Sequence, residues 1–350
     1  MKRIVAFLTA LLFLVPLLTA CRAMGKEKFV AYYYEYFDTV TQIIGYADSR
    51  EEFDAVCAAV KEQLAIYHRA YDIYHSYAGV TNLRDINRRE AGDGVAVAVS
   101  EPVFSLLTFC REMHTATGGR TNIAMGSVLS LWHTYRETGI DEPWAAELPP
   151  LADLQNAALH TDIANLVLDG EASTVLLADE EMSLDVGAIA KGYAAERVAD
   201  ALAEDGISGY LINLGGNVRA VGPRPDGSGW LVGVENPDKS SEEGYVEYLS
   251  ITDRAVVTSG VYQRYYTVDG VRYHHIIDPD TLFPGDRYLS VTVIAADSGV
   301  GDAFSTALFN MDREEGLALV EATEGLEAMW IFPDGSRAYS SGFAAYRSEE

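Results

Sequence analysis

Asp302 and Thr306 are the residues of this chain whose types and spacing best suit metal chemistry. They lie four residues apart in a segment expected to be helical over 302–311, so their side-chain oxygens can face the same way. Oxygen ligands suit Mg²⁺, which keeps several waters and usually takes only one or two carboxylates together with substrate phosphates. The alternative is that Asp302 is the ordinary N-cap of this helix.

A second segment, residues 185–193, reads Asp-Val-Gly-Ala-Ile-Ala-Lys-Gly-Tyr and leads into a helix expected over 188–204. A glycine turn before a helix presents backbone N–H groups and the positive end of the helix dipole to an anion. Lys191 adds a positive charge in the first turn. Because the pattern matches neither a P-loop nor the G-x-G-x-x-G fingerprint, it predicts either a diphosphate cradle or a plain strand-to-helix turn.

A third group of polar residues flanks an expected β-hairpin that turns at residues 268–270. Ser259 and Arg264 precede the hairpin, and His274 and His275 follow it. Because the two ends of a hairpin meet, these side chains should cluster. His275 is interpreted as a general base, a phosphate donor or a packed core histidine.

The charge balance limits the classes of partner. Asp and Glu number 52 against 26 Lys and Arg, which gives a formal net charge of -26 at pH 7. Such a surface repels nucleic acid, so no nucleic-acid partner is expected. A site for a phosphate-rich ligand would need a metal ion, a helix N-terminus or local Arg and Lys side chains to overcome this field.

Residues 1–20 have the pattern of an export signal, with Lys2 and Arg3 ahead of an apolar run that ends in Leu-Thr-Ala-Cys. This ending is a lipobox. Cleavage before Cys21 would leave that residue to carry lipid and would anchor the mature chain at the extracytoplasmic face of the cell membrane, with residues 21–29 as a linker. The alternative is one uncleaved transmembrane helix, although an apolar run of about 15 residues is short against the ~20 needed to span a bilayer.

Cys57 and Cys110 remain once Cys21 is assigned to lipid. Both lie in apolar stretches predicted to be helical core, so two buried free thiols are expected, with a disulfide between them as the alternative. Neither has a histidine at the spacing of a zinc site.

The elements that must position these residues are helices and strands in irregular alternation. Apolar periodicity predicts the helices, and alternating runs bounded by glycine predict the strands. Because regular βαβ spacing does not occur, the pattern favours an α+β fold over a doubly wound sheet, and the length alone allows one large domain or two. The expected helices cover 49–74, 101–115, 188–204 and 302–311, and the expected strands cover 37–43, 210–214, 218–221, 230–234, 245–251, 255–257 and 289–295.

An ordered set of motifs makes the chain resemble the ApbE family of flavin transferases from about residue 30 to 345. Each motif alone is a weak signal, but nine in the family's order argue against chance. The motifs are F-D-T at 37–39, L-R-D-I-N at 83–87, L-W at 131–132, D-V-G-A-I-A-K-G-Y at 185–193, N-L-G-G-N at 213–217, E-N-P at 235–237, S-G-V-Y-Q-R-Y at 259–265, H-H-I-I-D-P at 274–279 and D-A-x-x-T-A-L at 302–308.

The resemblance implies a single domain over residues 30–347 with a duplicated, interleaved, T-fold-like α+β architecture, in which mixed or antiparallel sheets are flanked by helices. This domain is expected to bind FAD with Mg²⁺ beside its diphosphate. It further implies transfer of FMN to a threonine hydroxyl of an exported or membrane redox protein, with release of AMP. The implied metal ligands are the Ala188 carbonyl, Asp302 and Thr306, and some members of the family have Asp at the position of Ser305. The implied flavin-nucleotide contacts are Tyr77, Arg120, Thr121, Asn122, Asp185, Lys191, Ser259, His275 and Ile277.

The chain departs from the family pattern at three points. No M-G-T sequence precedes Phe37, residues 119–122 read Gly-Arg-Thr-Asn where the family has G-x-F-D, and Leu282 replaces a glycine.

The resulting hypothesis is Mg²⁺-dependent FMN transfer, with His275 as the candidate base and Asp302 acting through the metal. One alternative is a Mg²⁺-dependent FAD pyrophosphatase that yields FMN and AMP. The other is a surface lipoprotein that binds flavin without catalysis.

Overall fold

A computed structural model describes residues 25–88, 94–262 and 264–348. The expected signal over residues 1–20, the lipidation residue Cys21 and Gln263 of the S-G-V-Y-Q-R-Y motif lie outside the described residues. Within the described ranges, none of the helices combines the length and the apolar character that crossing a bilayer requires.

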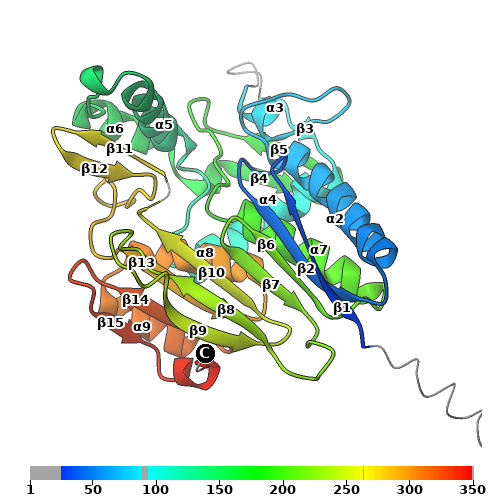
Figure 1. Ribbon diagram of the computed structural model, residues 1–350. Coiled ribbons are helices and arrows are strands. Elements are labelled where there is room, and N and C mark those ends of the chain that lie inside the picture. The colour runs from blue at the N-terminus through cyan, green and yellow to red at the C-terminus, as the bar shows by residue number, and fades with distance from the viewer. Residues whose placement is uncertain (1–24, 89–93, 263, 349–350) are drawn as a thin grey trace, which may run out of the picture.

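An eight-stranded antiparallel sheet forms the centre of the fold, in the order β1-β2-β6-β7-β10-β13-β14-β15 (Figure 1). Strands β6 and β7 are joined by Gly215 and Gly216, whose φ angles of 58° and 94° favour glycine. The strands are β1 Glu27–Tyr33, β2 Thr41–Ala47, β6 Tyr210–Leu214, β7 Asn217–Val221, β10 Ala255–Gly260, β13 Ser290–Ala295, β14 Glu327–Ile331 and β15 Arg337–Tyr339.

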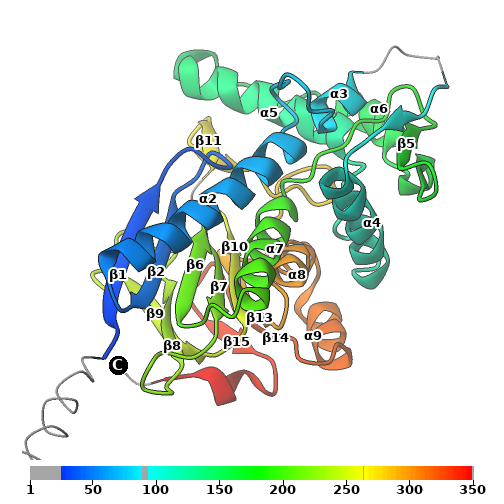
Figure 2. The same cartoon turned by 90° about the vertical axis from the view of Figure 1, so that its right-hand side faces the viewer.

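Helices α2, α7, α8 and α9 cover one face of this sheet (Figure 2). Two apolar clusters fill the space between the layers, one beneath α2 and α7 and the other beneath α8 and α9. The apolar periodicity of each helix therefore fixes which side faces the sheet. The helices are α2 Arg50–Tyr71, α3 Leu83–Asn87, α4 Glu101–Ala116, α5 Gly126–Asp141, α6 Leu151–Ala157, α7 Ala190–Glu204, α8 Ser298–Phe309 and α9 Arg313–Ala322.

A two-stranded sheet covers part of the opposite face. It consists of β8 (Trp230–Glu235) and β9 (Tyr245–Ile251), which alternate buried and more exposed residues. Trp230 and Leu249 pack with Val256 and Ile294 of the large sheet in a third apolar cluster. This packing secures β10 and β13 from behind, so that their other face can support α8.

A lobe at one end of the molecule combines α5 and α6 with the hairpin of β11 (Tyr265–Val268) and β12 (Val271–His274) (Figure 1). The hairpin turns through Asp269 and Gly270, both with positive φ, as a two-residue turn requires. The remaining strands are β3 Val97–Ala98, β4 Leu166–Asp169 and β5 Thr174–Leu177, and short 3₁₀ turns cover Pro143–Ala145, Ala158–His160, Ile163–Asn165 and Phe343–Tyr346.

The structure confirms the α+β class, and every pairing between the named strands is antiparallel. Cys57 and Cys110 are buried and free, as expected. The strand expected over 37–43 is wrong in its first half, because Phe37 and Asp38 have φ angles of 55° and 48° and β2 begins only at Thr41. An additional strand, β1, begins at Glu27, before the domain boundary expected at residue 30.

Candidate active site

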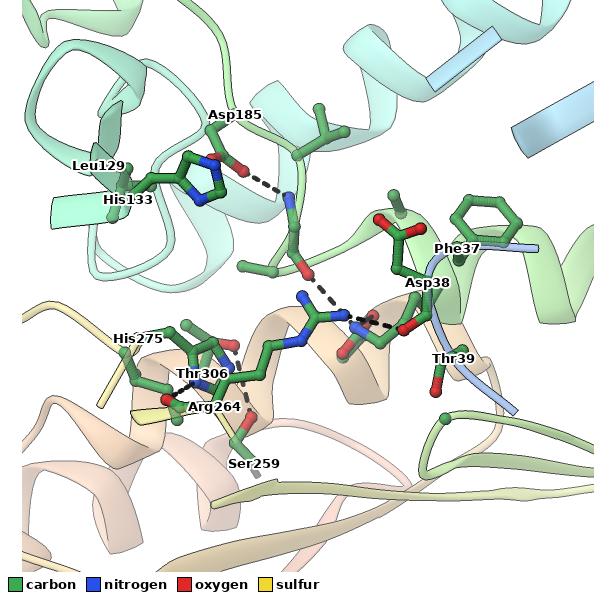
Figure 3. A pocket seen from close by; sticks show the side chains of 18 of the residues that line it. Phe37, Asp38, Thr39, Leu129, His133, Asp185, Ser259, Arg264, His275 and Thr306 are labelled. Carbon is green, nitrogen blue, oxygen red and sulfur yellow. Dashed lines mark hydrogen bonds and ion pairs between the residues drawn. The ribbon is translucent and has the colours of Figure 1, made fainter. Parts of the chain in front are cut away.

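A cavity of about 1060 Å³ lies where the helix layer meets the lobe and the β1–β2 connection (Figure 3). This volume is at the upper end of the range for small-molecule and cofactor sites, so a dinucleotide is a suitable occupant. Every described residue that the sequence analysis assigned to the site lines this cavity. These residues are Tyr77, Arg120, Thr121, Asn122, Asp185, Ala188, Lys191, Ser259, His275, Ile277, Asp302 and Thr306.

Asp302 lies in the second turn of α8, and this corrects two expectations. The helix begins at Ser298 rather than at residue 302, and its N-cap is Asp297, whose side chain accepts a hydrogen bond of 2.9 Å from the Val300 N–H. The first turn escaped sequence reasoning because Ser298, Gly299 and Gly301 are weak helix formers. The carboxyl of Asp302 is therefore not used to cap α8.

Gly192 brings the start of α7 against α8. Its N–H donates a hydrogen bond of 2.8 Å to Oδ2 of Asp302. A Cβ atom at this position would lie 2.3 Å from the Ser298 carbonyl oxygen and 2.5 Å from Cβ of Asp302, so only glycine permits this approach. The close contact between the two helices fixes the Asp302 carboxylate at the cavity wall.

The carboxyl of Asp302 is buried, and burial raises its pKa, while the Lys191 ammonium and the Gly192 N–H oppose this change. Oδ2 carries both of these contacts, whereas Oδ1 makes no hydrogen bond with the described residues.

Thr306 follows Asp302 by one turn of α8. Its Oγ1 lies 3.5 Å from Oγ of Ser259, and Oγ of Ser259 lies 2.8 Å from Oγ of Ser305.

The chemistry of this donor set fits Mg²⁺. One carboxylate, a threonine hydroxyl and the nearby Ala188 carbonyl are hard oxygen ligands, and Mg²⁺ needs few of them from the protein. Among residues 25–88, 94–262 and 264–348, no group of three or more His, Cys, Asp or Glu side chains is arranged to hold a metal. A metal at Asp302 would therefore depend on further oxygens from its ligand.

The turn before α7 differs from the expected cradle. The Gly187 N–H donates to Oδ1 of Asp185 at 2.8 Å, and the Gly192 N–H is used by Asp302, so neither is free for an anion. Lys191 lies in the first turn of α7, as predicted, and its Nζ donates to the Gly187 carbonyl at 3.3 Å. Burial raises the pKa of Asp185, and the charges of His133, Arg136 and Arg264 act against this rise.

The two adjacent histidines have different roles. His274 is buried, its Nε2 donates to the Gly285 carbonyl at 2.7 Å, and its Nδ1 accepts from the Ile276 N–H at 3.2 Å, so both nitrogens are used. His275 faces the cavity, and its Nδ1 lies 3.2 Å from the Arg264 carbonyl. Because a carbonyl only accepts, Nδ1 carries the hydrogen and Nε2 is left as an acceptor.

Desolvation, aided by the charges of Arg264, His274 and Lys191, lowers the pKa of His275 to about 3. The ring is therefore neutral at physiological pH. A neutral imidazole with a bare Nε2 can accept a hydrogen bond from a hydroxyl, but so low a pKa makes it a weak base.

Comparison with known proteins places this geometry in a family. The sequence profile of the ApbE family matches residues 37–330. The chain belongs to the ApbE family. The FAD:protein FMN transferase of Klebsiella pneumoniae is 36% identical over 252 residues, which cover 72% of this chain and 75% of that protein. The corresponding protein of Treponema pallidum is 34% identical over 260 residues, with 70% of each chain covered.

Solved structures of ApbE proteins have the same fold. The crystal structure of the ApbE protein from Thermotoga maritima matches with a TM-score of 0.80 at 27% identity, covering 92% of this chain and 100% of that one. The flavin transferase ApbE from Vibrio cholerae matches with a TM-score of 0.75 at 26% identity, covering 91% and 100% respectively.

Three of the residues expected to contact flavin use their polar groups inside the protein in this ApbE chain. Thr121 donates to the Ala303 carbonyl at 2.6 Å, and Asn122 donates to the Thr161 carbonyl at 2.8 Å. Arg120 is paired with Asp280 and lies 3.6 Å from Glu315. This segment lines the cavity, and its expected flavin contacts stay a prediction. Ile277, also at the wall, accepts from Asn310 through its carbonyl at 3.3 Å.

Tyr77 belongs to a network at the end of α2. Its hydroxyl donates to Oδ2 of Asp72 at 2.7 Å and lies 3.4 Å from Nε2 of His68. Nδ1 of His68 accepts from the Phe37 N–H at 3.2 Å. The network therefore holds the left-handed turn at Phe37 and Asp38 against the cavity.

Sequence reasoning missed several residues that line the cavity. Arg264 was expected near Ser259, but its reach across the cavity to the Asp38 carbonyl, at 3.4 Å, was not (Figure 3). His133 and Arg136 of α5 also line the cavity. Asp185 lies beside His133 (Figure 3). The polar residues that follow Trp132 in the L-W motif could have indicated this part of the site, but the same pattern is typical of a solvent-exposed helix face.

The walls of this cavity carry nearly balanced charge. Among the described residues, four Lys and Arg side chains and five Asp and Glu side chains line it. A diphosphate would therefore meet no net positive field, and a divalent cation would supply the missing charge. The basic residues are Arg120, Arg136, Lys191 and Arg264, and the acidic residues are Glu35, Asp38, Asp72, Asp185 and Asp302.

Proposed function

We propose that this protein is a Mg²⁺-dependent FAD:protein FMN transferase that attaches FMN to a threonine hydroxyl of an exported redox protein and releases AMP. The transferase class follows from membership of the ApbE family and from relatives named FAD:protein FMN transferase. The threonine acceptor is what the family resemblance implies, and the metal is supported by one observation above the others. Asp302, Thr306 and the turn at Ala188 line one dinucleotide-sized cavity together with Lys191.

In the proposed reaction the acceptor oxygen forms a bond to the phosphorus of the FMN half, and the electron pair of the broken P–O bond leaves with AMP. The proton of the acceptor hydroxyl passes to the leaving phosphate or to solvent. When bound, Mg²⁺ would neutralise charge that develops on the diphosphate. Lys191 and Arg264 add positive charge at the cavity wall. Nε2 of His275 would accept a hydrogen bond from the acceptor hydroxyl and orient it, because a ring with a pKa of about 3 takes a proton poorly.

The proposal is tested by incubating the purified full chain with FAD, with or without Mg²⁺, and with an exported redox domain that carries a threonine acceptor. We expect a mass increase of one FMN on the acceptor and an equal amount of AMP, both only with Mg²⁺. An acceptor in which the threonine is replaced by Val is the control. Free FMN with AMP would instead identify a pyrophosphatase, and intact FAD would identify a flavin-binding lipoprotein.

We also propose that the protein is anchored at the extracytoplasmic face of the cell membrane through lipid on Cys21. The lipobox supports this location, although it lies outside the described residues. We expect Cys21→Ser to move the protein from the membrane fraction to the soluble fraction or to leave it as an uncleaved precursor. Mass spectrometry of the N-terminal peptide provides the measurement, and an unmodified Cys21 in the wild-type protein would contradict the proposal.

A further inference from the structure

The ammonium of Lys191 lies beside one of the proposed metal ligands, the Asp302 carboxylate. Its Nζ is 3.8 Å from Oδ2 of Asp302 and 3.3 Å from the Gly187 carbonyl oxygen. The carboxylate is one proposed metal ligand, and the Gly187 carbonyl directly precedes the Ala188 carbonyl, which is another. The lysine side chain is 24% exposed and that of Asp302 only 6%, so this pair is well shielded from solvent.

A single carboxylate cannot serve both cations equally well. Like charges a few ångströms apart repel strongly when solvent screening is weak. Within the described ranges no group of three or more His, Cys, Asp or Glu side chains is arranged to hold a metal, and Lys191 is the charged group that acts on Asp302. A divalent ion that enters beside Asp302 must therefore displace the ammonium or bring anionic charge with it.

A diphosphate supplies that charge. Lysine carries its charge on a flexible four-carbon stem, so the ammonium can turn from one anionic partner to another without movement of the backbone. Lys191 starts from the first turn of α7, at the wall of the same cavity that would hold the diphosphate. The Lys191 ammonium can therefore move from the Asp302 carboxylate to the diphosphate, and the metal ion can take its place at the carboxylate.

We propose that Lys191 competes with Mg²⁺ for the Asp302 carboxylate, and that the diphosphate of the dinucleotide ends this competition by attracting the ammonium. The inference rests on the proposed function, because it concerns regulation of the same site. Its consequence is that metal and dinucleotide bind with positive coupling, so the metal binds weakly until FAD is present.

The test uses the purified full chain and two separate titrations. Mn²⁺ is titrated in the absence of FAD and followed by electron paramagnetic resonance of the free ion. FAD is titrated with EDTA present and followed by flavin fluorescence, so that no turnover occurs. We expect Lys191→Met to bind Mn²⁺ at least ~5-fold more tightly than wild type and FAD at least ~5-fold more weakly, in line with typical coupling between sites.

Opposite changes in the two affinities distinguish competition from structural damage, which would weaken both. Lys61→Met, on α2 and outside the cavity, should change neither affinity, and Lys191→Arg, which keeps the charge, should bind Mn²⁺ no more tightly than wild type. Adding Asp302→Asn to Lys191→Met should remove the gain in Mn²⁺ affinity. Equal or weaker Mn²⁺ binding by Lys191→Met, or no binding by either chain, would overturn the proposal. Neither titration contains an acceptor protein or requires FMN transfer. The two affinities therefore test this proposal even if the protein does not transfer FMN.

Discussion

Asp302→Asn is expected to lower kcat/KM for FMN transfer about a thousandfold, equivalent to about 4 kcal/mol of transition-state stabilisation. The substitution removes the negative charge proposed to hold the metal. It keeps an oxygen that can accept the hydrogen bond from the Gly192 N–H, so the contact between α7 and α8 should survive. Transfer is measured at saturating Mg²⁺ by the mass of the acceptor domain.

The same variant should be at least as stable as wild type. Burial raises the pKa of Asp302, and a carboxyl whose pKa is higher in the folded protein opposes folding when it is ionised at neutral pH. Asparagine removes this cost, so the thermal midpoint should stay equal or rise. Asp297→Asn is the matched control, because asparagine also caps helices well and Asp297 lies outside the cavity. Wild-type transfer by Asp302→Asn would refute the metal assignment.

Gly192→Ala is expected to lower the free energy of unfolding by about 1–3 kcal/mol, the usual cost of overpacking a core, and also to abolish most transfer activity. The added methyl group would lie 2.3 Å from the Ser298 carbonyl oxygen, which is backbone and cannot turn aside. The start of α8 must therefore move away from α7, and Asp302 moves with it. Chemical denaturation and the transfer assay measure the two effects on one protein preparation.

Gly316→Ala in α9 makes the same chemical change with the opposite expectation. There the added methyl would meet Cδ2 of Leu308 at 3.2 Å, and a leucine side chain can adjust by a few tenths of an ångström. Because alanine is a better helix former than glycine, this control should be neutral or up to ~1 kcal/mol more stable. Similar losses in both variants would show that the α7–α8 contact has no special role.

Several of the helices could be predicted from local sequence. The helix expected over 101–115 is Glu101–Ala116 in the structure, and the one expected over 49–74 is Arg50–Tyr71. In both, apolar residues recur at helical spacing and polar residues mark the ends. The hairpin at residues 268–270 was also predictable, because Asp-Gly is a strong turn signal.

Segments whose conformation depends on tertiary contacts could not be predicted from local sequence. The left-handed turn at Phe37 and Asp38 is held by His68, which is 31 residues from Phe37, so the flanking apolar residues suggested a strand. No helix was expected over Gly126–Asp141. Its apolar residues can be recognised as one face only from their packing against α6 and the β11–β12 hairpin.

The candidate site was predicted mainly through its resemblance to a family, since single motifs gave weak signals. The resemblance indicated His275, but sequence alone could not show how the rings of His274 and His275, which both line the cavity, are hydrogen-bonded. Neighbouring residues at the end of a strand point to opposite sides, and their partners depend on the register in which Tyr265 pairs with His274. The structure resolves this through the partners of each ring.

The cavity draws its walls from stretches spread between Tyr34 and Asn310, and Asp302 and Thr306 come from nearly the last part of the chain. The ribosome must therefore synthesise almost the whole polypeptide before the cavity can be complete. A chain cut before α8 would keep most of its strands and still lack the part of the cavity wall that carries Asp302 and Thr306. A ligand of the complete cavity can therefore bind only after nearly the whole chain has been synthesised.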